Sequence, residues 1–250
     1  MFEGPGNDPF IVLNDADLEA AVEELFSTKY MYSGQACIAP ERIYVQKEVY
    51  ETFINEFADK TKSLVIGDPK NPETDVCPLA SRRAVENIKR QLVDAKKKGA
   101  RIICGGKIDG NLVYPTIVAD ANHSMIGMRE EVFGPVSYVC KFDSAEKAVA
   151  LAKDSKYGLR AIIYGKKEAR WIANALKGAD YLEDVEDYTF GKFGTLSINE
   201  PRAVTWRDAL VTKPIGGYGY SGWVWDFKDG KFILRQGPKL FSLETSVAMS

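Results

Sequence analysis

Apolar residues recur three or four positions apart in several stretches of the chain, which is the spacing of one face of a helix. The first stretch, 15–32, opens with two Asp residues, and Asp suits a helix N-terminus. The same pattern predicts further helices at about 48–64, 81–98, 144–154 and 166–177. Shorter runs rich in Val, Ile and Tyr predict strands at 10–13, 42–46, 101–104, 113–118, 135–142, 160–164 and 195–199.

Predicted strands and helices alternate along most of the chain. Such alternation is typical of an α/β domain with a mainly parallel sheet and flanking helices. The segment 65–80 contains Gly and three Pro residues and is predicted to be a loop. The last part of the chain, 232–248, is again strand-rich, and no repeat or low-complexity tract interrupts the order.

Length and charge narrow the classes of protein that fit this pattern. A chain of 250 residues predicts one large domain, or one domain with an appendage. The net charge is −2 and no five like charges stand together, so no nucleic-acid partner is expected. No apolar run approaches the roughly 18–20 residues of a membrane span, and the start MFEGPGNDPF does not resemble a secretion signal. The expected location is the cytoplasm.

Cysteine and histidine are scarce. The chain has four Cys residues without a Cys-x-x-Cys pair, and its only histidine is His123. This number is too small for a disulfide scaffold and predicts no Cys/His metal site. Because the chain has a single histidine, the most common general base is available at only one position.

Cys37 is the first candidate for chemistry, because it stands in a Gly-containing loop, SGQAC, between a predicted helix and a predicted strand. A thiol on such a loop is a nucleophile if nearby amides stabilise the thiolate. The alternative is a buried structural cysteine, which the local sequence alone favours. A Cys/His hydrolase would need His123 as its base, although DANHS is more typical of an exposed polar loop.

Two further segments combine carboxylates with tight turns: EGPGNDP at 3–9 and EEVFGPV at 130–136. With the Cys37 loop they resemble, in the same order, three motifs of the aldehyde dehydrogenase superfamily. Glu3 and Cys37 are 34 residues apart, as expected of that family. Further matches are Tyr-Gly-Leu at 157–159, Gly-x-x-x-x-Asn at 194–199, Pro-Ile-Gly-Gly at 214–217 and Ser-Gly at 221–222. The literal GxGxxG at 217–222 belongs to this match rather than to a dinucleotide fingerprint, which needs a flanking strand and helix.

The resemblance implies oxidation of an aldehyde to a carboxylic acid with NAD or NADP. Cys37 would be the nucleophile, and its backbone amide would help to bind the oxyanion. Glu3 would activate the hydrolytic water, while Glu131 and Phe133 would contact the nicotinamide ribose. None of these roles needs a histidine.

The resemblance also implies a substrate end of the site, formed by Asn199, Trp206 and Arg202. Arg202 and the nearby Arg207 would favour an aldehyde with a carboxylate or phosphate tail. The alternative reading is that both arginines are solvated surface residues. The implied partner is a small-molecule aldehyde.

Departures from the family pattern are as informative as the matches. Pro5 stands where the family usually has a Gly. Cys77, which precedes Pro-Leu, also stands where a Gly is usual, and 181–193 looks like an insertion. Glu3 stands almost at the start of the sequence, whereas the family carries a long cofactor-binding segment before it. The sequence therefore predicts an aldehyde-dehydrogenase-like catalytic domain at 1–222 and a strand-rich tail at 223–250 that packs on this domain or on another subunit.

A catalytic half of this kind predicts that most of the cofactor site lies outside the chain, and that the isolated chain oxidises aldehydes poorly. Its partner would be a separately encoded cofactor-binding half, and its exposed apolar surface predicts a homo-oligomer. Two other functions remain open. One is an inactive remnant that binds a partner protein, and the other is a cofactor-free thiol esterase.

Overall fold

The computed structural model describes residues 4–177, 193–200 and Ser221, and the backbone of 225–228, 231–234 and 246–249. Its main strands are β1 (Asp8–Val12), β2 (Pro40–Gln46), β3 (Arg101–Cys104), β6 (Thr116–Ala119), β7 (Val136–Phe142), β8 (Arg160–Tyr164), β9 (Thr195–Ile198) and β12 (Ser246–Met249). They form one sheet in the order β12-β9-β8-β1-β2-β7-β6-β3. Only β3 runs antiparallel to its neighbour, so the predicted α/β class with a mainly parallel sheet is confirmed.

Two small antiparallel pairs lie outside this sheet. They are β4 (Ile108–Asp109) with β5 (Leu112–Val113), and β10 (Trp225–Lys228) with β11 (Lys231–Leu234). The sequence had predicted a single strand over 113–118, which the structure divides into β5 and β6. Pro115 stands at the break, and a proline lacks the N–H that would continue the ladder.

Among the described residues, five α-helices cover the sheet at the places the periodicity predicted, and most of their ends lie inside the predicted bounds. They are α1 (Leu18–Tyr30), α2 (Tyr50–Lys62), α3 (Arg82–Lys97), α4 (Ala145–Lys153) and α5 (Ala169–Lys177), with short 3-10 helices η1 (Met31–Gly34) and η2 (Ile126–Met128). The side chains of Asp17, Ser81 and Ser144 accept N–H groups of the first turns of α1, α3 and α4. These caps fix where the three helices begin.

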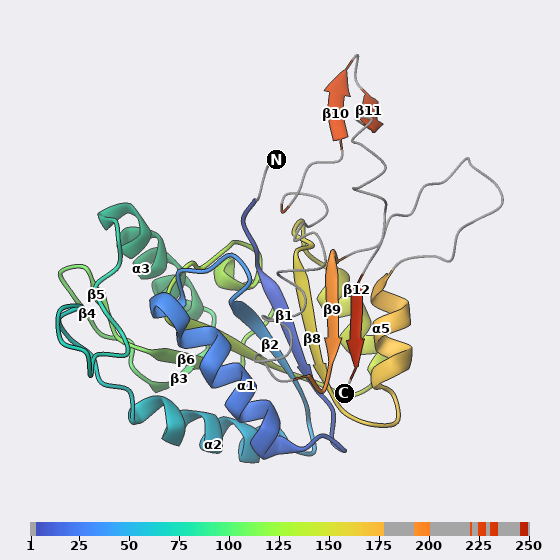
Figure 1. Ribbon diagram of the computed structural model, residues 1–250, viewed down its shortest axis with the longest axis horizontal. Helices are drawn as coiled ribbons and strands as arrows, with labels where there is room; N and C mark the ends of the chain where they lie inside the picture. The colour runs from blue at the N-terminus through green and yellow to red at the C-terminus, as the bar shows by residue number, and fades with distance from the viewer. Residues whose placement is uncertain are drawn as a thin grey trace.

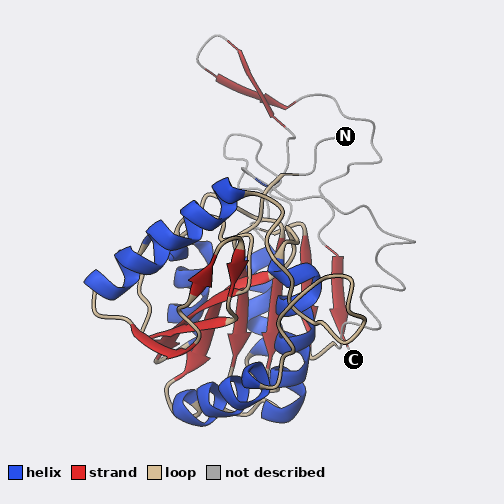
Figure 2. Cartoon of the chain, turned by 90° about the vertical axis from the view of Figure 1, so that its left-hand side faces the viewer, coloured by secondary structure: helices blue, strands red, loops and turns tan. Residues whose placement is uncertain are grey.

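The sheet lies between two helical layers, each with its own apolar core. Strand β1 shows the division, because it is buried along its whole length and its side chains alternate between the layers. Phe10 and Val12 pack with α1 and α2, whereas Ile11 and Leu13 pack in the cluster that holds α3, α4 and α5. Figure 1 shows α1 crossing in front of the strands with α2 next to it, and Figure 2 shows helices on both sides of the sheet.

Three features of the described residues bear on function. None of their helices is both long and apolar enough to cross a bilayer. No three His, Cys, Asp or Glu side chains in this part of the chain gather into a set that suits a metal ion. All four cysteines are free thiols, and Cys140 is buried while the others are half-buried.

Candidate active site

The loops that carry the sequence motifs enter the sheet at a single edge. Strands β9, β8, β1, β2 and β7 are neighbours and run parallel, so their amino ends lie side by side. Cys37 lies just before β2, Gly158 before β8, the segment 4–7 before β1 and 131–135 before β7. Motifs that are distant in sequence therefore meet at this amino edge, which is the upper end of these strands in Figure 1.

The segment after Glu3 runs directly against the cysteine loop. A Cβ atom placed on Gly6 would lie 1.9 Å from the carbonyl oxygen of Cys37, closer than any side chain tolerates. Only glycine fits there, so the glycine of this turn allows the two loops to touch. Glu3 itself lies outside the described residues, and its role remains a prediction.

The chain reaches Cys37 through a strained turn in η1. Tyr32, Ser33 and Gly34 are all left-handed, with φ of 50°, 58° and 73°. This conformation is costly for a bulky residue such as Tyr32 and persists only where the surroundings hold it. The strained backbone therefore lies immediately before the candidate nucleophile.

The loop 77–80 supplies part of what holds this turn. The Ser33 hydroxyl accepts the backbone N–H of Cys77 at 2.8 Å. The Gln35 side-chain oxygen accepts the backbone N–H of Ala80 at 2.9 Å. The Ser and Gln of the cysteine motif thus bind a neighbouring loop and restrain the approach to Cys37.

The cysteine loop also contacts the loop 131–135. A Cβ on Gly34 would lie 2.3 Å from the carbonyl oxygen of Gly134, so these two backbones pack directly against each other. The preceding residue, Phe133, is left-handed with φ of 51°. Its side chain remains 37% exposed, which leaves an aromatic surface at the amino edge.

Glu131 lies on the inner side of the same loop. One of its carboxylate oxygens accepts the backbone N–H of Gly6 at 2.9 Å. Burial, and next the charge of Glu41, raise the pKa of Glu131 to about 7, whereas the Gly6 N–H and Lys29 act in the opposite direction. A carboxyl group that titrates near neutral pH therefore links the segment 4–7 to the loop with Phe133.

Ser221 ties a third motif to the same edge. Its hydroxyl donates to the Pro5 carbonyl at 2.5 Å and accepts the Gly158 N–H at 3.2 Å. Its carbonyl accepts the Gly4 N–H at 3.1 Å. The serine of the Ser-Gly motif thus joins the glycine turn to the Tyr-Gly-Leu loop, which explains why these three motifs occur together.

Asn199 does not lie with the other candidates. It follows β9, at the carboxyl end of the sheet, whereas Cys37 lies at the amino edge. Its side chain exchanges two hydrogen bonds with the backbone of Gly165, at 2.7 and 2.9 Å. Its role as a substrate contact remains a prediction. Trp206 and Arg202 lie outside the described residues.

His123 is not a partner of Cys37. Its two ring nitrogens lie 2.8 Å from the Tyr44 hydroxyl and 2.7 Å from a carboxylate oxygen of Asp154. The side chain is largely buried, so the reading as an exposed loop residue was wrong. Burial, the largest influence, lowers the pKa of His123. The Cys/His hydrolase alternative lacks its base.

Two buried charged residues near the site were missed from the sequence. Lys29 and Glu41 are fully buried, and the charges of both act on Glu131. A signal was present for each. Lys29 stands on the apolar face of α1, four positions after Leu25, and Glu41 stands beside Arg42 at the start of a buried strand. Charges in such places are rare unless they are paired.

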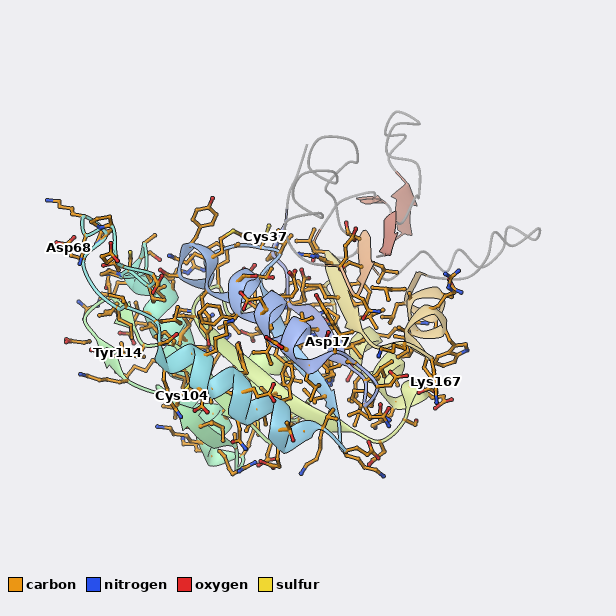
Figure 3. The ribbon with its side chains drawn as sticks, turned by 60° about the horizontal axis from the view of Figure 1, so that its bottom comes forward. Asp17, Cys37, Asp68, Cys104, Tyr114 and Lys167 are labelled. Carbon is orange, nitrogen blue, oxygen red and sulfur yellow. The ribbon has the colours of Figure 1, made fainter. Side chains whose placement is uncertain are left out.

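We expect Cys37 to be the most reactive of the four thiols at neutral pH. It lies half-buried on a loop, whereas burial raises the pKa of Cys104 and raises that of Cys140 to about 11. Figure 3 labels Cys37 and Cys104 in well-separated parts of the molecule. Limiting iodoacetamide followed by peptide mapping measures the order of labelling, with the denatured chain as control. First labelling of Cys77, Cys104 or Cys140 would contradict this expectation.

Comparison with known proteins agrees with this geometry. The model of the aldehyde dehydrogenase family matches residues 1–231. A probable succinate-semialdehyde dehydrogenase [NADP(+)] from Sinorhizobium fredii is 35% identical over 88% of this chain and 42% of its own length. A glutarate-semialdehyde dehydrogenase from Pseudomonas putida is 37% identical over 87% of this chain and 42% of its own.

Solved structures give the same result. Lactaldehyde dehydrogenase from Escherichia coli superposes with a TM-score of 0.77 at 32% identity, covering 88% of this chain and 43% of that one. An NADP-dependent glyceraldehyde-3-phosphate dehydrogenase from Bacillus halodurans, solved with NADP, also gives 0.77, at 30% identity with 88% and 43% coverage. The chain spans less than half the length of these relatives. Over that span, its sequence and its fold show that it belongs to the aldehyde dehydrogenase family.

Proposed function

We propose that this chain supplies the catalytic cysteine for NAD- or NADP-dependent oxidation of an aldehyde to a carboxylic acid. The observation that carries the proposal is the convergence of loops around Cys37. Gly6 contacts its carbonyl group, and the loops 32–34 and 131–135 pack against each other beside it. Membership of the aldehyde dehydrogenase family supports the same chemistry.

In this proposal the Cys37 thiolate forms a bond to the aldehyde carbonyl carbon, and the carbonyl oxygen becomes an oxyanion. The backbone N–H of Cys37 donates a hydrogen bond to that oxyanion. NAD or NADP, when held by Glu131 and Phe133, would supply the hydride acceptor that turns the Cys37 adduct into a thioester. Glu3 then takes a proton from the water that attacks the Cys37 thioester, which releases the carboxylic acid and restores the thiol.

Glu131 and Phe133 are the residues of this chain that would hold the nicotinamide end of the cofactor. The partly exposed ring of Phe133 offers a flat apolar surface, and a carboxylate such as Glu131 accepts hydrogen bonds from ribose hydroxyls. They contact only one end of a dinucleotide. We therefore infer that most of the cofactor site is supplied by polypeptide outside these 250 residues, such as a separately encoded half.

Trp206 and Arg202 are our candidates for the substrate end of the site. The two curated relatives described above are named for succinate and glutarate semialdehydes, which are aldehydes that carry a carboxylate. An arginine would pair with that group. We further propose that the protein works in the cytoplasm as a homo-oligomer.

The function is tested by adding succinate semialdehyde, with NAD or NADP, to the purified chain. We expect the aldehyde to protect Cys37 from alkylation in a saturable way, because the thiohemiacetal occupies the sulfur. We expect little cofactor reduction, because correct orientation of the reactants contributes roughly 7–11 kcal/mol to such a step and most cofactor contacts lie elsewhere. A panel of other aldehydes separates substrate choice from the reaction itself.

Each alternative predicts a different result. Saturable cofactor reduction that is lost in Cys37→Ala would show that the chain is a complete enzyme and that the half-enzyme proposal is wrong. Ester cleavage by Cys37 without any aldehyde protection would favour the thiol esterase. An inactive remnant would show neither protection nor ester cleavage, and that outcome would overturn the proposed function.

A further inference from the structure

A bulge at the start of β2 sets Glu41 apart from its neighbours. The parallel ladder between β1 and β2 skips a position, so that Pro9 pairs with Arg42 and Glu41 is the extra residue. Pro9 has no N–H to donate, which favours an irregularity at this point. Glu41 lies four residues beyond Cys37, and its side chain is fully buried.

The Glu41 carboxylate binds the loop 131–135 with both oxygens. One oxygen accepts the Phe133 N–H at 2.8 Å, and the other accepts the Val132 N–H at 2.9 Å. The side-chain amide of Asn7 donates to the second oxygen at 3.0 Å, and also to the carbonyls of two residues just before the loop, at 3.3 Å each. Three donors from two loops thus converge on one buried carboxylate.

Lys29 is the cation that balances this charge. It comes from the last turn of α1, is fully buried, and its ammonium has no hydrogen-bond partner among the described residues. The charges that act on it are those of Glu41 and then Glu131. Burial lowers the pKa of Lys29 to about 8 and raises that of Glu41. Burial therefore disfavours each charge, and the opposite charge of the other group offsets part of this cost.

The loop 131–135, which Glu41 binds, has a strained backbone that requires stabilising contacts. Phe133 is left-handed, a costly conformation that persists only where contacts enforce it. The hydrogen bond from the Phe133 N–H fixes this residue itself. The neighbouring Gly134 packs against the cysteine loop at Gly34, so a shift of the loop 131–135 would be transmitted toward Cys37.

We propose that Glu41, balanced by Lys29, is a positioning residue that fixes the loop 131–135 against the cysteine loop and so orients Glu131 and Phe133. That Glu131 and Phe133 are oriented toward a cofactor rests on the proposed function. That Glu41 fixes the loop 131–135 does not rest on it, and this part is measured on the chain alone.

The first test is amide hydrogen exchange in Glu41→Gln, measured by nuclear magnetic resonance. The amide side chain places an N–H where an acceptor is needed and removes the charge. We expect the Val132 and Phe133 amides to exchange roughly tenfold faster, while amides of β8 keep their rates. Glu24→Gln is the matched control, because Glu24 is another buried carboxylate, bound to Thr28 on α1 and paired with Arg160 of β8, so its loss should change exchange on those elements and not at Val132 and Phe133. Unchanged exchange at Val132 and Phe133 would overturn the proposal.

The second test is the titration of Glu131, followed by its carboxyl ¹³C shift and assigned with Glu131→Gln. Glu41 raises the pKa of Glu131, and Lys29 lowers it. The titration midpoint should therefore fall in Glu41→Gln and rise in Lys29→Met. Simple loosening of the site would expose Glu131 and lower its midpoint in both variants, an outcome that would overturn the proposal.

If Glu41→Gln does not fold, the double variant Lys29→Met/Glu41→Gln replaces it in the exchange experiment, because it removes both charges together. Lys29→Met alone then carries the titration. Neither measurement uses an aldehyde, a cofactor or turnover. If aldehydes fail to protect Cys37 while these results hold, the proposed function fails and the positioning of the loop stands.

Discussion

Cys37→Ala is expected to slow the release of p-nitrophenol from p-nitrophenyl acetate by roughly 10³-fold or more, as loss of a nucleophile does elsewhere. In this reaction the Cys37 sulfur bonds to the acetyl carbon and p-nitrophenolate leaves, so neither a cofactor nor hydride transfer is needed. The wild-type chain should gain one acetyl group at Cys37, as read by mass spectrometry of its peptides.

Cys77→Ala is the matched control for this experiment. Cys77 is also a half-buried thiol, and it lies on a loop bound to the turn before Cys37. Its hydrogen bond to Ser33 uses the backbone N–H, which alanine retains. The control should therefore keep the rate and the acetylation. If Cys77→Ala loses activity while Cys37→Ala keeps it, the nucleophile has been assigned to the wrong cysteine.

The layered fold followed from patterns that are local in sequence. In β1, Phe10 and Ile11 are both apolar, as a strand covered on both faces requires. Asp17 and Ser81, whose side chains cap the first turns of α1 and α3, lie within two residues of the predicted helix starts. Such signals need only neighbouring residues, so a single sequence contains them.

The meeting of the motifs depends on strand order, which local patterns do not contain. Gly6 touches Cys37 because β1 and β2 are adjacent and parallel. The position of Asn199 was hidden for the same reason. Its motif fixes a spacing along β9 but does not tell that the residue lies at the opposite end of the sheet from Cys37.

The buried charges were hidden for a different reason. A lysine or a glutamate such as Lys29 or Glu41 is expected at the surface, because an unpaired charge is rarely buried. Their burial is tolerated because the opposite charges of these two side chains, distant in sequence, act on each other. His123 likewise became a structural residue through Tyr44 and Asp154, which the sequence does not place beside it.

Glycine is needed either where the backbone is left-handed or where another loop packs too closely for a Cβ atom. Three glycine-to-alanine variants are expected to separate these two reasons. Gly99 is left-handed with φ of +86° and has open space around its Cβ position, so Gly99→Ala should cost only about 1–2 kcal/mol of unfolding free energy. Gly6 has no left-handed φ, but its Cβ would lie 1.9 Å from a backbone oxygen, so Gly6→Ala should cost about 1–3 kcal/mol through close contact. Gly34 combines both features, and Gly34→Ala should cost about 3–5 kcal/mol.

Urea unfolding of the full chain measures these losses, provided that two spectroscopic probes give coincident transitions. The alkylation rate of Cys37 adds a local readout. It should change in Gly6→Ala and Gly34→Ala, where the new methyl group displaces loops that touch the cysteine, and stay unchanged in Gly99→Ala at the end of α3. No loss in Gly6→Ala, together with equal losses in Gly34→Ala and Gly99→Ala, would mean that backbone conformation alone explains these glycines. The close packing of loops around Cys37, on which the proposed site depends, would then be incorrect.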